Sequence, residues 1–280
     1  MKYTHKIEAV MIKAVVFAAA AMTLTIVAGI VAYVLMKGIP HLNPGLFERT
    51  YTSENCSLYP AIINTITIVL LSLGISVPIG IGGAIYLVEY AKRGNPFVKM
   101  VYVTAETLAG IPSIVYGLFG YLFFVTYCKM QYSLLAGALT LSIMVLPVIL
   151  KTTQEALNSV PDSYREGSFG LGAGKLRTVF LVVLPSAIPG VLAGIILSIG
   201  RMVGETAALI FTAGSVAQIP TSLMGSGRTL AVHLYALWNE GLSTNAAYAT
   251  AVVLLVVVVI INILSNLIGK KLQGVQAGKA

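Results

Sequence analysis

The chain has 280 residues, of which 57% are hydrophobic and only 10% are charged. A soluble globular domain carries about a quarter charged residues, so this composition excludes an ordinary water-soluble protein. The net charge of +8 could suggest nucleic-acid binding, but the basic residues form no run longer than Lys92-Arg93 or Lys270-Lys271. They lie beside apolar stretches, which is typical of loops that flank a membrane.

Apolar stretches long enough to cross a bilayer, which takes roughly 20 residues, recur along the chain. The first follows a basic start and exceeds the about 7–15 residues of a signal-peptide core, so it is predicted to be a retained span. The second contains Pro60 and Pro78 and is expected to be partly loop or broken helix. The six predicted spans are 14–36, 55–88, 107–128, 130–150, 178–200 with a continuation past Arg201 and Glu205, and 241–269.

The basic residues predict the orientation of these spans. If the N-terminus is inside, 13 of the 18 Lys and Arg residues fall in inner segments. Cytoplasmic loops are the ones enriched in Lys and Arg. We therefore expect a multi-pass protein of the cell (inner) membrane with both termini in the cytoplasm.

Two stretches between spans are long enough to have a function of their own. The outer one, about 37–59, is rich in turn-forming residues. The inner one, 151–185, mixes charged residues with helix formers and ends at Pro185, which predicts short helices at the cytoplasmic face. We expect three parts: 1–60 with a cytoplasmic tail, the first span and the outer loop; a core, 61–270, that includes 151–185; and a cytoplasmic tail, 271–280.

The inner stretch carries six residues at fixed spacing: Glu166, Gly167, Ser168, Gly172, Leu184 and Pro185. They resemble the EAA loop of ABC-importer permeases, Glu-Ala-Ala, three residues, Gly, nine residues and Ile-x-Leu-Pro, with Val182 in place of the isoleucine. In that family the loop forms a coupling helix that docks in the ATPase. The small residues suit close approach of another backbone, and Arg165, Lys175 and Arg177 are expected to supply polar rim contacts. The alternative is a solvated amphipathic linker.

No residue pattern in the sequence predicts nucleotide, metal or cofactor binding. The run 170–175 is not a P-loop, because Phe169 stands where its first glycine is needed and Leu176 where its hydroxyl residue is needed. Cys56 and Cys128 lie far apart, and the three histidines give no metal-ligand spacing. The chain is therefore not expected to be an enzyme, and any ATP hydrolysis must come from a partner.

Arg201 and Glu205 lie inside the predicted fifth span. Residues four apart share one helix face, and charged residues in a membrane normally pair or line an aqueous path. Two interpretations stay open: a structural ion pair, or a pathway element for a charged substrate.

Five further motifs lie between residues 64 and 269: Asn64-Thr65, Pro78-Ile79-Gly80, Tyr86-Leu87, the run 110–117 (GIPSIVYG) and the run 204–207 (GETA). Together they resemble the phosphate-specific ABC permeases, most closely PstA-type subunits. The resemblance implies an all-α, six-span permease of the type I importer fold that forms half of a phosphate pathway. It also implies that Arg201 assists phosphate passage with Glu205 as its acidic companion.

The same resemblance implies the partners. They are a related PstC-type permease, a pair of ATPase subunits and an extracytoplasmic phosphate-binding protein. Two alternatives remain: the same machine for another oxyanion such as sulfate or molybdate, and a non-conducting membrane adaptor in phosphate signalling. A secondary transporter working alone is disfavoured, because an EAA-type loop has no purpose without an ATPase.

Overall fold

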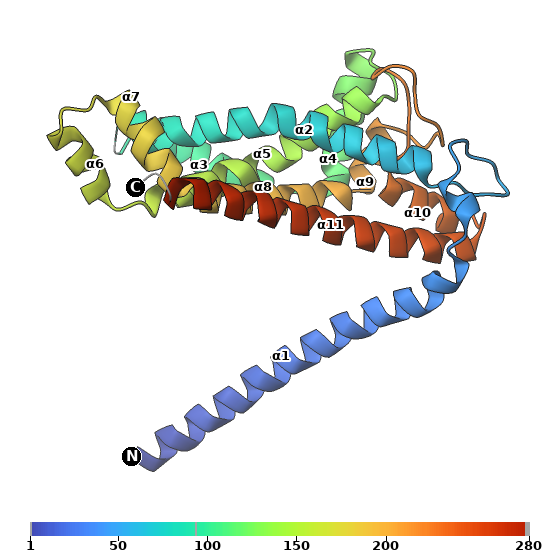
Figure 1. Cartoon of the computed structure of the whole chain (residues 1–280), viewed down its shortest axis with the longest axis horizontal. Helices are drawn as coiled ribbons and strands as arrows, with labels where there is room; N and C mark the ends of the chain where they lie inside the picture. The colour runs from blue at the N-terminus through green and yellow to red at the C-terminus, as the bar shows by residue number, and fades with distance from the viewer. Residues whose placement is uncertain (1, 93, 278–280) are drawn as a thin grey trace.

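All regular structure in the described part of the chain, residues 2–92 and 94–277 of this computed structural model, is helical (Figure 1). The helices are α1 (Lys2–Gly38), α2 (Tyr59–Ile85), α3 (Pro96–Ala109), α4 (Ser113–Gly120), α5 (Leu134–Asn158), α6 (Asp162–Gly170), α7 (Lys175–Thr178), α8 (Leu184–Val203), α9 (Ala207–Thr212), α10 (Leu230–Asn239) and α11 (Thr244–Ala277). Two segments form 3-10 helix, η1 (Ile39–His41) and η2 (Pro44–Phe47). Three form π-helix: η3 (Tyr86–Tyr90), η4 (Tyr121–Tyr127) and η5 (Val179–Val183).

Five helical stretches are long and apolar enough to cross a membrane, and a sixth span results only if a bent pair of helices counts as one span. The five are Met11–His41, Tyr59–Tyr90, Leu134–Asn158, Lys175–Val203 and Thr244–Ser265. They coincide with five of the predicted spans, and the all-α polytopic prediction is confirmed.

The third predicted span, 107–128, is not a single helix. The chain bends by 102° between Pro96–Ala109 and Ser113–Tyr127. Gly110 ends α3, and Pro112 precedes α4. Proline disfavours the helical conformation of the residue before it, so Ile111 cannot easily continue α3. The sequence Gly-Ile-Pro thus turns one apolar stretch into two helices.

Several boundaries also differ from the prediction. α1 begins at Lys2 and α5 continues through Asn158, so part of the expected cytoplasmic sequence is helical extension. α2 continues through Pro78, so the expected break is confined to the loop before Tyr59. α11 extends to Ala277, into the expected tail 271–280, whose last three residues lie outside the described part.

α5 occupies the centre of the bundle and packs against α2, α3 and α8. Its side chains at Leu141, Met144 and Ile149 are fully buried. Two glycines of α8 allow the close approach to α5: a Cβ on Gly190 would lie 2.6 Å from Ala156 Cβ, and one on Gly194 would overlap Thr152. Small residues at helix interfaces serve this purpose in membrane proteins.

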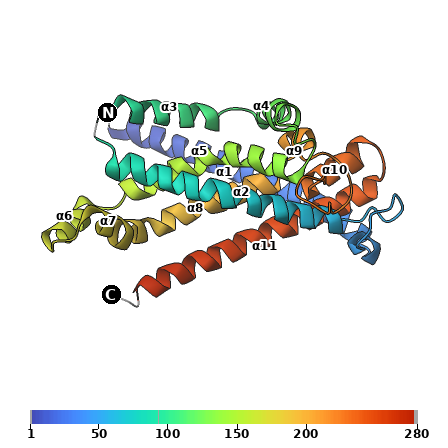
Figure 2. The ribbon, with the colours of Figure 1, turned by 90° about the horizontal axis from the view of Figure 1, so that it is seen from above.

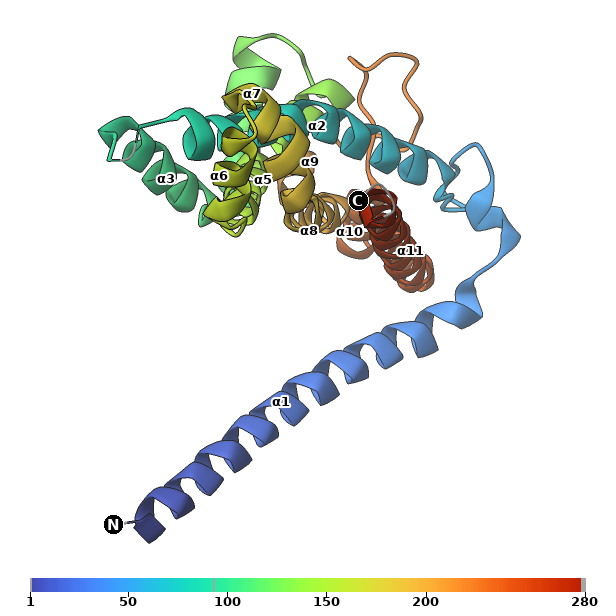
Figure 3. The same ribbon diagram turned by 60° about the vertical axis from the view of Figure 1, so that its left-hand side comes forward.

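α1 stands apart from the bundle. Figures 1 and 3 show it leaving the end where η1 and α10 lie and projecting away from the other helices, and none of its apolar window is buried. Figure 2 shows α3 and α4 along one edge of the bundle and α11 along the other. Near its C-terminal end α1 contacts α11, where Gly38 lies against Tyr248 and Val252.

We expect Gly194→Ala to lower the thermal unfolding midpoint of the purified protein by several degrees. The added methyl group overlaps Thr152, and overpacking of this kind costs about 1–3 kcal/mol. Gly200→Ala, on the same helix, is the control, because no atom lies within 4 Å of a Cβ there. Equal midpoints for the two variants would contradict this account of the α5–α8 interface.

Candidate functional site

Two helix breaks are followed by helices that pack against each other. The first separates α3 from α4, the second separates α8 from α9, and α4 packs against α9. The contact is close because Gly117 has no side chain: a Cβ there would lie 2.8 Å from Ala208 Cα and 3.1 Å from the Ala207 carbonyl. The structure therefore brings the motifs at 110–117 and 204–207 into contact.

Glu205 lies in the second break rather than on a helix face. α8 ends at Val203, and one carboxylate oxygen of Glu205 accepts a hydrogen bond from the Ala208 amide at 3.2 Å. The side chain thus caps the first turn of α9. The expectation that Arg201 and Glu205 share one helix face is wrong, because the helix does not reach Glu205. Among the described residues no ion pair joins the two.

Arg201 is half-buried in the last turn of α8, beside the second break. The helix dipole favours a cation at the C-terminal end of a helix. This stabilising role of Arg201 is structural and would apply in any protein. Its charge also lies within electrostatic reach of Tyr116 in α4. The Tyr116 hydroxyl donates to the Leu108 carbonyl at 2.8 Å and so connects the two sides of the first break.

This arrangement suits an anion in transit. Arginine stays protonated and offers several donors to oxygen pairs. Interrupted helices near the centre of a span are where transporters commonly place substrate sites, because free backbone groups and helix ends face the ligand there. The geometry therefore supports a pathway element at Arg201 and a helix-capping role for Glu205.

The predicted coupling residues separate into two groups. Glu166 and Gly167 are exposed on α6, and Ser168 connects α6 to α7 through a hydroxyl contact of 2.8 Å with Thr178. Leu184 and Pro185 instead lie in the first turn of α8, where proline's missing N–H is tolerated. The surface segment is thus α6 and the turn after it, which is shorter than the expected 151–185.

The backbone conformation at position 172 explains why a glycine stands there. Its φ is +81°, a left-handed conformation that other residues rarely adopt, and it follows the C-terminal end of α6. Its amide donates to the Phe169 carbonyl at 2.9 Å, as at many helix ends. A Cβ would meet no atom within 4 Å, so the position is open to a partner as well.

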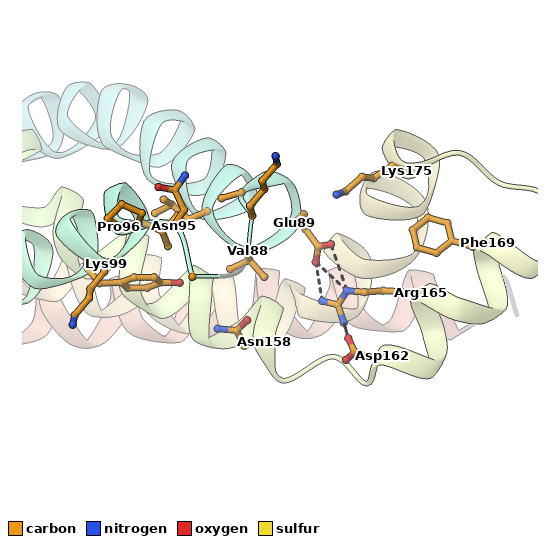
Figure 4. A pocket seen from close by; sticks show the side chains of 16 residues that line it. Val88, Glu89, Asn95, Pro96, Lys99, Asn158, Asp162, Arg165, Phe169 and Lys175 are labelled. Atoms are coloured by element: carbon orange, nitrogen blue, oxygen red, sulfur yellow. Dashed lines mark hydrogen bonds and ion pairs between the residues drawn. The ribbon is translucent and has the colours of Figure 1, made fainter.

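An ion pair that the sequence did not indicate holds α6 to the bundle. Arg165 lies 2.7 Å from Glu89, at the end of the second span, and only 14% and 8% of their side chains are exposed (Figure 4). Arg165 also donates to the Val160 and Leu157 carbonyls and to Asp162. The prediction that Arg165 is a rim contact is therefore wrong: it is an internal anchor.

A cleft of about 940 Å³ opens beside this ion pair, between α3 and α6 (Figure 4). Its lining is rich in basic side chains: Lys92, Lys99, Arg165 and Lys175. Lys175 also lies over the Tyr90 ring at 5.1 Å, which holds it against η3.

Large apolar side chains project from the same segment into solvent. Leu171 is 91% exposed, and Tyr164, Phe169 and Leu176 are also exposed. Exposed apolar groups gathered among polar ones mark surfaces that bind another protein. The apolar residues within this charged loop could have indicated the surface from the sequence. They are not part of the EAA spacing, so that motif did not identify them.

Comparisons with known proteins agree on one family. The model of the binding-protein-dependent transport system inner membrane component family matches residues 76–274. A probable ABC transporter permease protein, YqgI, of Bacillus subtilis is 31% identical over 89% of this chain and 91% of its own length. The phosphate transport system permease protein PstA of Pasteurella multocida is 36% identical over 83% of this chain and 84% of its own.

A solved structure shares the fold. A chain of a bacterial alginate ABC transporter, in complex with a periplasmic protein bound to an alginate pentasaccharide, aligns with a TM-score of 0.64 over 92% of this chain and 95% of its own. The sequence identity is 16%, so this likeness concerns the fold alone.

We predict that Arg165→Gln loosens α6. The change leaves the Glu89 carboxylate without its cation, and breaking a largely buried pair costs about 3–5 kcal/mol. Limited proteolysis should then cut the segment 160–175 several-fold faster than in the wild type. Arg177→Gln, an exposed neighbour, should leave the cleavage rate unchanged. Equal rates for Arg165→Gln and wild type would show that the pair does not hold the segment.

Proposed function

The chain belongs to the binding-protein-dependent transport system inner membrane component family, and from that premise we propose that it is the phosphate permease subunit of an ATP-driven importer. It is a transport subunit and not an enzyme. It forms half of the translocation pathway, and a separate subunit hydrolyses ATP. The observation that carries the substrate assignment is the Arg201 guanidinium at the meeting of two interrupted helices.

Phosphate suits that guanidinium. It carries between one and two negative charges near neutral pH, and an anion in a low-dielectric passage must replace its lost hydration with donors or opposite charge. Arg201 has no carboxylate partner among the described residues, so its charge is available to a passing anion. The similarity to PstA of Pasteurella multocida favours phosphate over other oxyanions.

The surface segment around α6 is the docking element for the ATPase. Gly167 and Gly172 leave room for another backbone, and Leu171 and Phe169 offer apolar contacts. The Glu89–Arg165 pair joins this element to the second span. A displacement of α6 by the ATPase thus reaches the transmembrane helices through a short, partly buried connection.

The remaining partners follow from the family. Its members work with a second permease, an ATPase and a substrate-binding protein; here we propose a PstC-type permease and a phosphate-binding protein. The unburied apolar length of α1 fits packing against that second permease. The ends of α1 and α11 point toward the α6–α7 end (Figure 1), which we assign to the cytoplasm together with both termini.

Arg201→Gln should reduce ATP-dependent phosphate uptake by reconstituted complex by about tenfold or more, because a hydrogen bond to a charged group contributes about 1.5–3 kcal/mol. Glu205→Gln should have a smaller effect, since the glutamine oxygen still accepts from the Ala208 amide. The double variant Arg201→Gln/Glu205→Gln should stay as inactive as Arg201→Gln. Recovery of uptake in the double variant, with normal assembly, would assign the two charges a purely architectural role.

Gly167→Trp is the sharper test of docking. Gly167 is exposed on α6 and a Cβ there meets nothing within 4 Å, so the added side chain starts from open space on the face that we propose for the partner. We expect a complex that fails to assemble or hydrolyses ATP without substrate-linked stimulation.

Gly172→Trp should have the same effect, with added backbone strain, and Gly172→Asn serves as its control because asparagine tolerates the left-handed conformation. Assembly is checked by subunit recovery and coupling by ATPase assay. Normal coupled transport in Gly167→Trp would remove the docking role from α6.

A further inference from the structure

A buried polar cluster lies at the end of the bundle opposite α6 and α7, where α10 meets the segment before α2 (Figure 1). Arg228 is 4% exposed and His233 is fully buried. Within the described part of the chain, four of the cluster's polar atoms have no hydrogen-bond partner: Arg228 Nε and Nη2, Thr229 Oγ1 and Asn64 Oδ1. The His233 imidazole interacts with the Cys56 backbone.

Such a cluster is costly unless something binds it. A buried donor without a partner costs about 1–3 kcal/mol, and an unpaired buried charge costs several times more. No carboxylate of the described residues pairs with Arg228. The Tyr51 ring, 4.6 Å from the guanidinium carbon, offsets part of the cost through a cation–π contact. The ring contact does not satisfy the two N–H donors.

The donors without partners match an oxyanion. Nε and Nη2 lie on the same edge of the guanidinium, so their N–H groups point in one direction and fit two oxygens of one ligand. The Thr229 hydroxyl adds a third donor. Burial and the Arg228 charge lower the pKa of His233 to about 3, against the opposing effect of a hydrogen bond to the Cys56 backbone, so its imidazole is neutral near neutral pH and adds no positive charge beside Arg228.

Hydrogen bonds from Asn64 hold the backbone of the loop at Arg228 and do not involve the arginine side chain. Asn64 donates to the Gln218 and Arg228 carbonyls at 2.8 and 3.2 Å. Gly227 allows this contact, because a Cβ there would lie 2.6 Å from Asn64 Nδ2. The Asn64-Thr65 motif thus holds the loop before α10, with Thr65 accepting from the Leu230 amide at 2.9 Å.

Tyr51 covers the cluster from the segment before α2. Its ring also makes an edge contact with His233, with the ring centroids 5.9 Å apart. The residues around it belong to a loop, and loops rearrange more readily than packed helices. A shift of this one segment would uncover the guanidinium.

We propose that Arg228 and Thr229 form a second anion site for a small inorganic oxyanion, bordered by the neutral His233, covered by Tyr51 and distinct from Arg201. Only the identification of phosphate as the natural anion rests on the proposed function. A water molecule could accept from the Arg228 N–H groups but would leave the charge unbalanced.

The test uses the assembled complex of permease pair and ATPase in the Arg201→Gln background, so that binding at Arg201 is removed. Inorganic phosphate is titrated against chloride at constant ionic strength while the unfolding midpoint of this chain is followed. We expect phosphate to raise the midpoint by about 2–4 °C and chloride to leave it unchanged. Additional Arg228→Gln should abolish the rise, and additional Arg49→Gln, on the exposed outer segment, should preserve it.

Thr229→Val covers the case in which Arg228→Gln does not assemble. It keeps the shape and removes a hydroxyl that has no partner, so in a purely structural cluster the variant would be no less stable, and any phosphate response, arising elsewhere, would be unchanged. A bound oxyanion loses one donor, and the phosphate response should fall several-fold. A full response in Thr229→Val or Arg228→Gln, an equal response to chloride, or no response in the background complex would each overturn the second site. Loss of uptake in Arg201→Gln would still support the proposed function in all three cases.

Discussion

The need to satisfy every backbone polar group inside the protein governs this structure. Lipid offers no hydrogen bonds, so a helix can be interrupted within a membrane only where other parts of the protein replace the missing partners. Both central breaks meet this condition through side chains: the Tyr116 hydroxyl binds the Leu108 carbonyl, and Glu205 accepts from the Ala208 amide. The breaks are therefore built features, and the one charged residue of α8, Arg201, lies in the last turn before the second break.

Three arginines illustrate how burial decides what a charge can do. Arg165 has a carboxylate and two backbone carbonyls, so its charge is fully used in holding α6. Arg201 lies at the end of a helix and has no carboxylate partner among the described residues. Its guanidinium is therefore able to bind an anion and release it. Arg228 is the most deeply buried and has two free donors under an aromatic ring. Coulomb attraction strengthens as water is excluded, so the same side chain is an anchor at Arg165 and, in our proposals, a pathway element at Arg201 and a covered site at Arg228.

The sequence predicted what depends on composition and local pattern. Apolar length was enough for five of the six predicted spans, and the fixed spacing of Glu166 and Gly172 located the surface segment at α6. The bend at Gly110 was harder to predict, because an apolar stretch has the same composition whether it forms one helix or two. The Glu89–Arg165 pair joins residues 76 positions apart, and no local pattern encodes such a contact. The wrong pairing of Arg201 with Glu205 had a local cause: helical spacing was assumed past Gly204, where α8 ends.

α2 connects the two ends of the molecule. At one end it leads into η3, whose Glu89 holds α6; near the other it carries Asn64 and Thr65, which hold the loop before α10. The helix continues through Pro78 without interruption, and its 27 residues span about 40 Å at 1.5 Å per residue. Packed interiors resist compression, so a long helix buried against α5 transmits displacement along its axis rather than absorbing it. A movement imposed on α6 therefore has a direct structural connection to the Arg228 loop, and the central breaks beside Arg201 lie between the two.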